Sequence, residues 1–75
     1  MRNLSEISSG ITCKVVWLIG FLGRSIRESA LFEEESLLSM IFNLGEYGVI
    51  VCCNGKRIAM DAQSARAVKV TLELS

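Results

Sequence analysis

The residues of this chain that could carry out chemistry are few, and histidine is absent from the sequence. Three cysteines are present, Cys13, Cys52 and Cys53. Successive residues of a strand point to opposite faces, so Cys52 and Cys53 could not readily hold one metal ion together. The sequence therefore favours small hydrophobic cysteines, buried or half-exposed, over a metal site, and we expect no resident cofactor.

The acidic groups do not complete a catalytic set either. Without histidine, the usual general base and the usual serine or cysteine triads are missing. Asp61, the cysteines and the glutamates remain, and no activating neighbour is evident for any of them, so we expect a protein without catalytic residues. The run Glu33-Glu34-Glu35 is typical of a solvated turn. A divalent cation there would need further oxygen ligands that converge on one point.

Size and composition limit the possible classes of protein. The chain has 75 residues, 51% of them hydrophobic, and eight Lys and Arg balance eight Asp and Glu. This length predicts a single domain, residues 1–75, with one small core. The even charge argues against nucleic acid as a partner. The longest uncharged apolar stretch, Val15 to Gly23, is too short for membrane insertion, and no signal peptide is recognisable. An odd cysteine count with two adjacent residues does not resemble a disulfide framework, so we expect a cytoplasmic location.

The first half of the chain predicts one strand and one short helix. Residues 1–10 form an N-terminal segment whose Leu4 and Ile7 could reach the core. Residues 11–19 are rich in β-branched side chains and predict a strand, with Cys13, Val15, Trp17 and Ile19 on one face. Gly20 to Gly23 would then be a flexible break. Residues 24–32 predict a helix of two turns with Ile26, Ala30 and Leu31 on one face and a capping box from Ser25 to Glu28.

The second half predicts a hairpin and a final strand. Residues 36–44 fit a buried helix or a strand covered on both faces, and local propensity favours the helix. Asn54-Gly55 between two apolar runs, residues 49–53 and 56–60, predicts a tight type I′ hairpin. Its inner face would hold Val49, Val51, Cys53, Ile58 and Met60. Asp61 can cap a short turn, and residues 67–74 predict a last strand with Val68, Val70, Leu72 and Leu74 inward.

Together these elements predict a mainly β fold. About five short strands, with one short α-helix inserted after the first, must close or nearly close to hide their edges. A small β-barrel is therefore the expected architecture.

The order of these elements and several motifs resemble the FeoA family, small proteins of bacterial ferrous iron transport with an SH3-like β-barrel. Segments 4–16, 27–31, 44–51, 54–60 and 61–70 carry the resemblance. Among them, Leu44-Gly45-Glu46-Tyr47-Gly48 is similar to the family's leucine-glycine-aspartate-proline turn, and residues 54–60 are similar to its glycine-containing hairpin. The chain departs from the pattern at Ala30, where glycine is usual, and at Glu33-Glu34, which replaces proline-glycine. The resemblance implies that residues 36–44 are a strand.

The resemblance also implies a function in binding. Such a protein would be a cytoplasmic accessory that binds and modulates the GTPase-containing membrane transporter FeoB, and would be peripheral to the inner membrane through this partner. We expect the partner-binding residues to be Ile26, Leu31, Ile50, Cys52 and Arg57. Other interpretations of these residues are open. Ile26 and Leu31 could belong to the core, and Arg57 could be a solvated charge. The face of Ile50 and Cys52 could be covered by residues 1–10 or by a second copy in a homo-oligomer. The alternative function is a metal-responsive regulatory domain similar to the SH3-like third domain of iron-dependent repressors.

Overall fold

The computed structural model describes residues 2–72 and shows six strands and two α-helices in that range. In chain order the elements are β1 Arg2–Asn3, a 3-10 helix Leu4–Glu6, β2 Thr12–Leu18, α1 Gly20–Glu28, β3 Leu37–Asn43, a second 3-10 helix Gly45–Tyr47, β4 Val49–Cys53, β5 Lys56–Met60, α2 Ala62–Arg66 and β6 Val68–Leu72. The fold is mainly β, as predicted, with the long helix directly after the first long strand. A two-residue strand and a second short helix add to the expected elements. Within residues 2–72, no helix has the length and apolar character needed to cross a bilayer.

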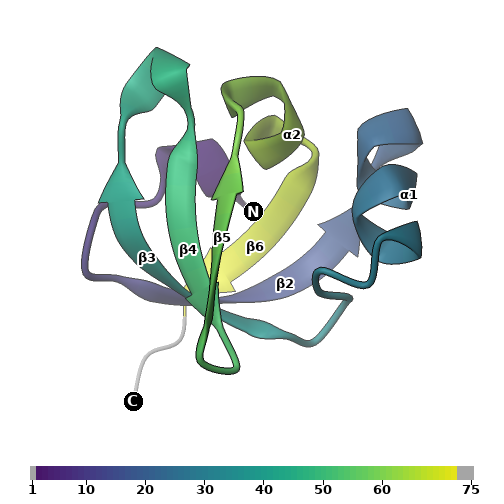
Figure 1. The fold of residues 1–75 in the computed structure, drawn as a ribbon, viewed down its shortest axis with the longest axis horizontal. Coiled ribbons are helices and arrows are strands. Elements are labelled where there is room, and N and C mark those ends of the chain that lie inside the picture. Colours follow the sequence, from purple (N-terminus) through teal and green to yellow (C-terminus); the bar gives the residue numbers. More distant parts are fainter. Residues whose placement is uncertain (1, 73–75) are drawn as a thin grey trace.

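The strands form one antiparallel sheet in the order β1-β6-β2-β3-β4-β5. The sheet curls strongly, so that β3, β4 and β5 face β6 and β2 (Figure 1). Among the described strands, β1 and β5 each have a hydrogen-bonded neighbour on one side alone, and α2 packs near the opening between them. The barrel is therefore open along β5, and the candidate site described below lies around this edge.

The core fills the inside of the curled sheet. Leu4, Ile7, Val15 and Leu38 have at most 1% of their surface exposed, which confirms that the N-terminal segment reaches the core. Asn43 fixes this segment in place, because its side-chain amide donates to the carbonyls of Ser5 and Ile7 at 2.9 and 2.7 Å.

A β-bulge corrects the predicted face of β2. The register with β6 moves from Val15 opposite Val70 to Trp17 opposite Lys69, so Val16 is the extra residue. A bulge shifts the alternation by one position. Trp17 is consequently 57% exposed instead of inward, and Leu18 takes the buried place.

Helix α1 begins earlier than predicted, at Gly20. The expected flexible break, residues 20–23, is its first turn, and Ser25 lies inside the helix, so the predicted capping box is wrong. Gly23 explains the difference: a Cβ there would lie 2.5 Å from the Leu18 carbonyl carbon, so glycine lets α1 pack directly on β2. The helix ends at Glu28, and Ala30 follows with φ 57°. The prediction that Ala30 and Leu31 share a helical face with Ile26 is therefore wrong.

Segment 36–44 contains β3, as the resemblance implied and against its helical propensity. Backbone pairing with β2 and β4 on both sides outweighs a propensity of a few tenths of a kcal/mol per residue. Leu38 and Met40 are buried, whereas Leu37 is 53% exposed.

The hairpin and the last strand follow the prediction closely. Asn54 and Gly55 have φ values of 53° and 80°, as a type I′ turn requires, and the five predicted inner residues are buried. Asp61 caps α2 by accepting a hydrogen bond from the Ser64 amide at 2.7 Å. In β6, Val68 and Val70 are fully buried, and Leu72, paired with buried Cys13, lies on the same inner face as predicted but is 37% exposed near the strand end. The predicted residues Glu73 and Leu74 lie outside the described residues.

Candidate functional site

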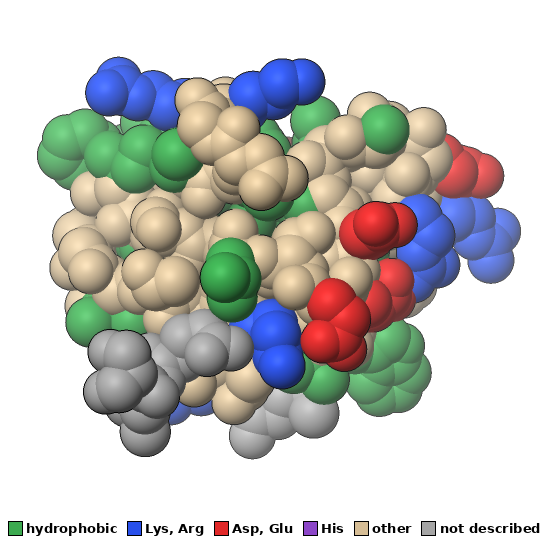
Figure 2. Space-filling view, turned by 90° about the horizontal axis from the view of Figure 1, so that it is seen from below, with side chains coloured by type: hydrophobic (Ala, Val, Ile, Leu, Met, Phe, Trp, Pro, Cys, Tyr) green, Lys and Arg blue, Asp and Glu red, His purple; other side chains and the backbone are tan. Residues whose placement is uncertain are grey.

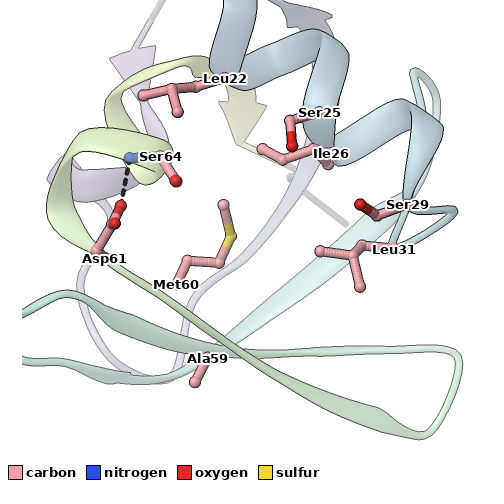
Figure 3. A pocket seen from close by; sticks show the side chains of 9 residues that line it. All are labelled: Leu22, Ser25, Ile26, Ser29, Leu31, Ala59, Met60, Asp61 and Ser64. Carbon is pink, nitrogen blue, oxygen red and sulfur yellow. Dashed lines mark hydrogen bonds between the residues drawn. The ribbon is translucent and has the colours of Figure 1, made fainter.

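The free edge of β5 is flanked by hollows on two sides. On one side a groove of about 240 Å³ separates β5 from α1; we call it the α1–β5 groove. It is lined by Leu22, Ser25, Ile26, Ser29, Leu31, Ala59, Met60, Asp61 and Ser64. Figure 3 shows Ser25 and Ile26 of α1 across the groove from Met60 and Ala59, with Leu22 extending toward α2 and Asp61 and Ser64 at the α2 end. The walls are thus mixed, with five apolar residues, three serines and one aspartate.

The α1–β5 groove continues toward the hairpin turn. A second hollow of about 290 Å³ shares Leu31 with the groove and reaches Cys53 and Asn54. The groove therefore touches the end of β5 at Ala59 and Met60, and the second hollow reaches the hairpin turn that precedes β5.

A further hollow lies on the outer face of the hairpin. This outer cleft, about 310 Å³, is lined by Leu44, Tyr47, Val49, Ile50, Ala59, Met60 and Asp61. Tyr47 is 81% exposed. Ala59, Met60 and Asp61 line both the outer cleft and the α1–β5 groove, so the end of β5 is the wall between them.

The five residues expected to bind a partner all lie around this edge. Ile26 is buried, with 5% of its surface exposed, and forms part of the groove wall on α1. Leu31 is 43% exposed and lines both hollows beside α1. Ile50 lies half-buried in the outer cleft, and Cys52, also half-buried, pairs in register with exposed Arg57. The structure therefore brings together side chains from α1, β4 and β5.

Several lining residues were missed by the sequence reasoning. Leu22 had been assigned to a flexible break, Met60 to the core, and Leu44 and Tyr47 to the turn region. The Asn-Gly turn does place Ala59 on the outer face, because that face follows from hairpin alternation. The position of β5 at the end of the sheet leaves no comparable local signal, since it depends on which strands pair.

The acidic run is partly neutralised by neighbouring cations. Glu34 pairs with Arg27, and Glu35 lies 3.6 Å from the Lys14 ammonium. The pKa of Glu34 is lowered, first by a backbone hydrogen bond; desolvation opposes this effect, and the hydrogen bond and charge of Arg27 lower the pKa further. Figure 2 shows acidic side chains gathered on the α1 side of the face seen from below, with basic side chains against them. Across residues 2–72, no three His, Cys, Asp or Glu side chains converge as metal ligands would.

The cysteines are separated in the fold. Cys13 lies on β2, whereas Cys52 and Cys53 lie on opposite faces of β4, and all are free thiols. Burial raises the pKa of Cys13 to about 11, which keeps this thiol protonated at neutral pH. A thiol in that state is a poor nucleophile and a poor metal ligand.

The curled sheet, the inserted helix and the open β5 edge define a small mainly β domain of the SH3-like class. A scan against models of protein families found no match, and no curated protein sequence matches significantly.

Solved structures are similar to the chain over most of its length. The crystal structure of an iron uptake regulatory protein, FeoA, superposes with a TM-score of 0.79 at 22% identity and covers 93% of each chain. The NMR structure of a FeoA-like protein from Clostridium acetobutylicum gives 0.83 at 14% identity, with 99% of this chain and 88% of the other covered. A manganese-dependent transcriptional repressor gives 0.81 at 16% identity, with 93% of this chain but 40% of the repressor. The fold is therefore that of FeoA and FeoA-like proteins, as the sequence motifs implied.

Proposed function

We propose that this chain is an accessory protein of ferrous iron transport that binds the cytosolic GTPase region of the membrane transporter FeoB and modulates it. The observation that carries the proposal is the similarity to FeoA over 93% of both chains, which leaves little of either chain unmatched. The motifs at residues 44–51 and 54–60 support it independently, because they form the turn and hairpin that the resemblance implied.

The chemistry of the surface favours binding over catalysis. The cysteine with the most shielded thiol, Cys13, is held in its protonated form. Asp61 is engaged by the Ser64 amide, and Glu34 by Arg27. By contrast, large apolar side chains remain exposed near β5, among them Leu31, Leu44 and Tyr47. Exposed apolar groups beside a groove are typical of a surface that recognises another macromolecule.

We assign the contact surface to Ile26, Leu31, Ile50, Cys52 and Arg57. Leu31 and Ile50 would supply apolar contact on the two sides of β5, with Ile26 beneath as a rigid wall. Arg57 is exposed at the rim, where a charge steers association more than it adds affinity.

The test is to titrate the purified protein with the cytosolic GTPase region of a ferrous iron transporter, with and without nucleotide. Ile50→Asp should weaken binding roughly tenfold or more, because it places a charge in a desolvated apolar contact. Ile11→Asp is the matched control: Ile11 is 41% exposed, precedes β2 and lines neither hollow beside β5. Absence of binding in every nucleotide state, and to the full-length transporter, would refute the proposal.

A second candidate is a metal-responsive regulatory domain, favoured by the TM-score of 0.81 with the manganese-dependent transcriptional repressor. Titration with ferrous ion under anaerobic conditions tests it. Stoichiometric binding at micromolar concentration would support this candidate over the accessory protein.

A further inference from the structure

The edge of β5 that no described strand pairs carries free backbone groups, and the α1–β5 groove adjoins this edge at Ala59. Cys53 and Lys56 flank the two-residue turn, and the register then pairs Val51 with Ile58 and Val49 with Met60. In an antiparallel pair, alternate residues exchange hydrogen bonds with the neighbouring strand and those between point away. The amides and carbonyls of Arg57 and Ala59 therefore point away from β4, and within residues 2–72 no backbone hydrogen bond engages them.

The α1–β5 groove adjoins these groups at the end of β5. Its opposite wall is formed by Leu22 and Ile26 of α1 and by Leu31 of the segment that follows the helix (Figure 3). Neighbouring strands of a sheet lie about 4.8 Å apart, so a strand added to β5 would run along the side on which the α1–β5 groove lies.

The α1–β5 groove and the outer cleft match the alternation of side chains along such a strand. A residue opposite Ile58 would point inward, toward Ile26 and Met60 in the α1–β5 groove. A residue opposite Ala59 would point outward, into the outer cleft beside Ile50 and Tyr47. Ala59 has a small side chain, which leaves the outer position open.

Charge selects the next residue of the bound segment. Arg57 and Lys56 are exposed, and neither has an ion-pair partner in the part of the chain that the structure describes. A residue opposite Arg57 would lie on the same outer face, within reach of its guanidinium. An acidic residue fits this position.

We propose that β5 receives an extended segment of the partner as an additional antiparallel strand, hydrogen-bonded to Arg57 and Ala59. Read from its N-terminus, this segment has two successive apolar residues followed by an acidic one, opposite Ala59, Ile58 and Arg57. Addition of a strand at a sheet edge draws affinity from the main chain and specificity from pockets for alternate side chains. The inference deepens the proposed function and rests on it for the identity of the partner.

Amide hydrogen exchange tests the hydrogen bonds in the unmodified protein. In the free protein, the amides of Ile58 and Met60 should be protected and those of Arg57 and Ala59 should exchange rapidly. On saturation with the GTPase region, exchange at Arg57 and Ala59 should slow roughly tenfold or more, while Ile58 and Met60 change little.

Two variants of Ala59 test the same contacts by binding. Ala59→Pro removes the amide that faces the groove, and proline is tolerated on an edge strand whose N–H faces outward. Ala59→Ser keeps the amide and a small side chain. Ala59→Pro should weaken binding at least tenfold and Ala59→Ser by less than about threefold. The exchange experiment decides the question if Ala59→Pro fails to fold.

Synthetic peptides separate this inference from the identity of the partner. Ser-Thr-Val-Leu-Glu-Thr-Ser should protect the amides of Arg57 and Ala59, and the same peptide with lysine for glutamate should bind roughly fivefold more weakly. Protection by the peptide without binding of the GTPase region supports the strand site and refutes the proposed partner. Binding of the GTPase region without protection of these amides overturns the strand site alone. If the amides of Arg57 and Ala59 are protected in the protein alone, and more so as its concentration rises, the occupant is a second copy of the chain. This result would also overturn the proposal of a partner strand at β5.

Discussion

Gly48 joins the second 3-10 helix to β4, and its replacement by alanine should destabilise the fold strongly. Gly48 has φ 115° and ψ −164°, a backbone conformation that is essentially restricted to glycine. A Cβ there would also lie 2.1 Å from the carbonyl oxygen of Met60, the last residue of β5. The carbonyl belongs to the backbone of a paired strand, so it cannot move without disturbing the hairpin.

The magnitude follows from these two effects. The backbone conformation costs about 1–3 kcal/mol for alanine, and relief of the overlap costs about 1–3 kcal/mol more. Alanine recovers about 0.4–1 kcal/mol through the lower entropy of the unfolded chain. We expect Gly48→Ala to lower the free energy of unfolding by about 3 kcal/mol. For a domain of this length, the total is only about 4–11 kcal/mol.

Gly45→Ala is the matched control, three residues earlier in the same turn. Gly45 also has a positive φ, 65°, but a Cβ there meets nothing within 4 Å. The left-handed conformation alone should cost about 0.5–1 kcal/mol after the same entropy correction.

Urea denaturation followed by far-UV circular dichroism measures both variants. Fluorescence is less suitable, because the single tryptophan, Trp17, is already 57% exposed in the folded protein. Equal midpoints for Gly48→Ala and Gly45→Ala would refute the reasoning, since the close approach to Met60 would then carry no cost.

The remaining predictions concern the core, the cap and the thiols. Leu38→Ala should lower the free energy of unfolding, measured by urea denaturation, by about 2–5 kcal/mol, because Leu38 is fully buried. Leu37→Ala, at a neighbour that is 53% exposed, should change it by no more than about 0.5 kcal/mol. Similar losses in the two variants would contradict the assignment of buried and exposed faces in β3. Asp61 has a lowered pKa because its carboxylate accepts a hydrogen bond from the Ser64 amide. Its contribution to stability is therefore present above the ordinary pKa of 3.8 and is lost as the pH falls through the lower pKa of the folded state. Asp61→Ala should flatten that part of the acid denaturation profile. A thiol reagent at neutral pH should modify half-buried Cys52 first and Cys13 only on unfolding, and a fast phase that survives Cys52→Ser would argue against this order. Burial raises the pKa of Cys13 from 9.0 to about 11, so stability should decline as the pH rises through this interval, and Cys13→Ala should reduce the decline.

Local sequence was sufficient for elements defined by neighbouring residues. The hairpin from Val49 to Met60 appears with its predicted bounds, because Asn54-Gly55 supplies the positive φ angles and the flanking residues alternate. Asp61 caps α2 for an equally local reason, a carboxylate followed three residues later by the amide it accepts.

Other features depend on contacts between distant residues, and there the sequence reasoning was wrong or ambiguous. The bulge at Val16 arises from pairing with β6, more than fifty residues away, and it exposes Trp17. The start of α1 depends on close packing of Gly23 against Leu18, which overrides the reading of two glycines as a break. For residues 36–44, periodicity could not decide between helix and strand until partners on both sides were known.

The candidate site shows the same division. The sequence by itself determined that the chain is mainly β, that Asn54-Gly55 turns a hairpin, and that Ile50 and Cys52 share its outer face, because alternation along a strand is a local property. Only the tertiary structure decided that β5 ends the sheet and that α1, with Ile26, stands across a groove from it. An edge is defined by the strand that is missing beside it, and a groove by the distance between elements remote in the chain.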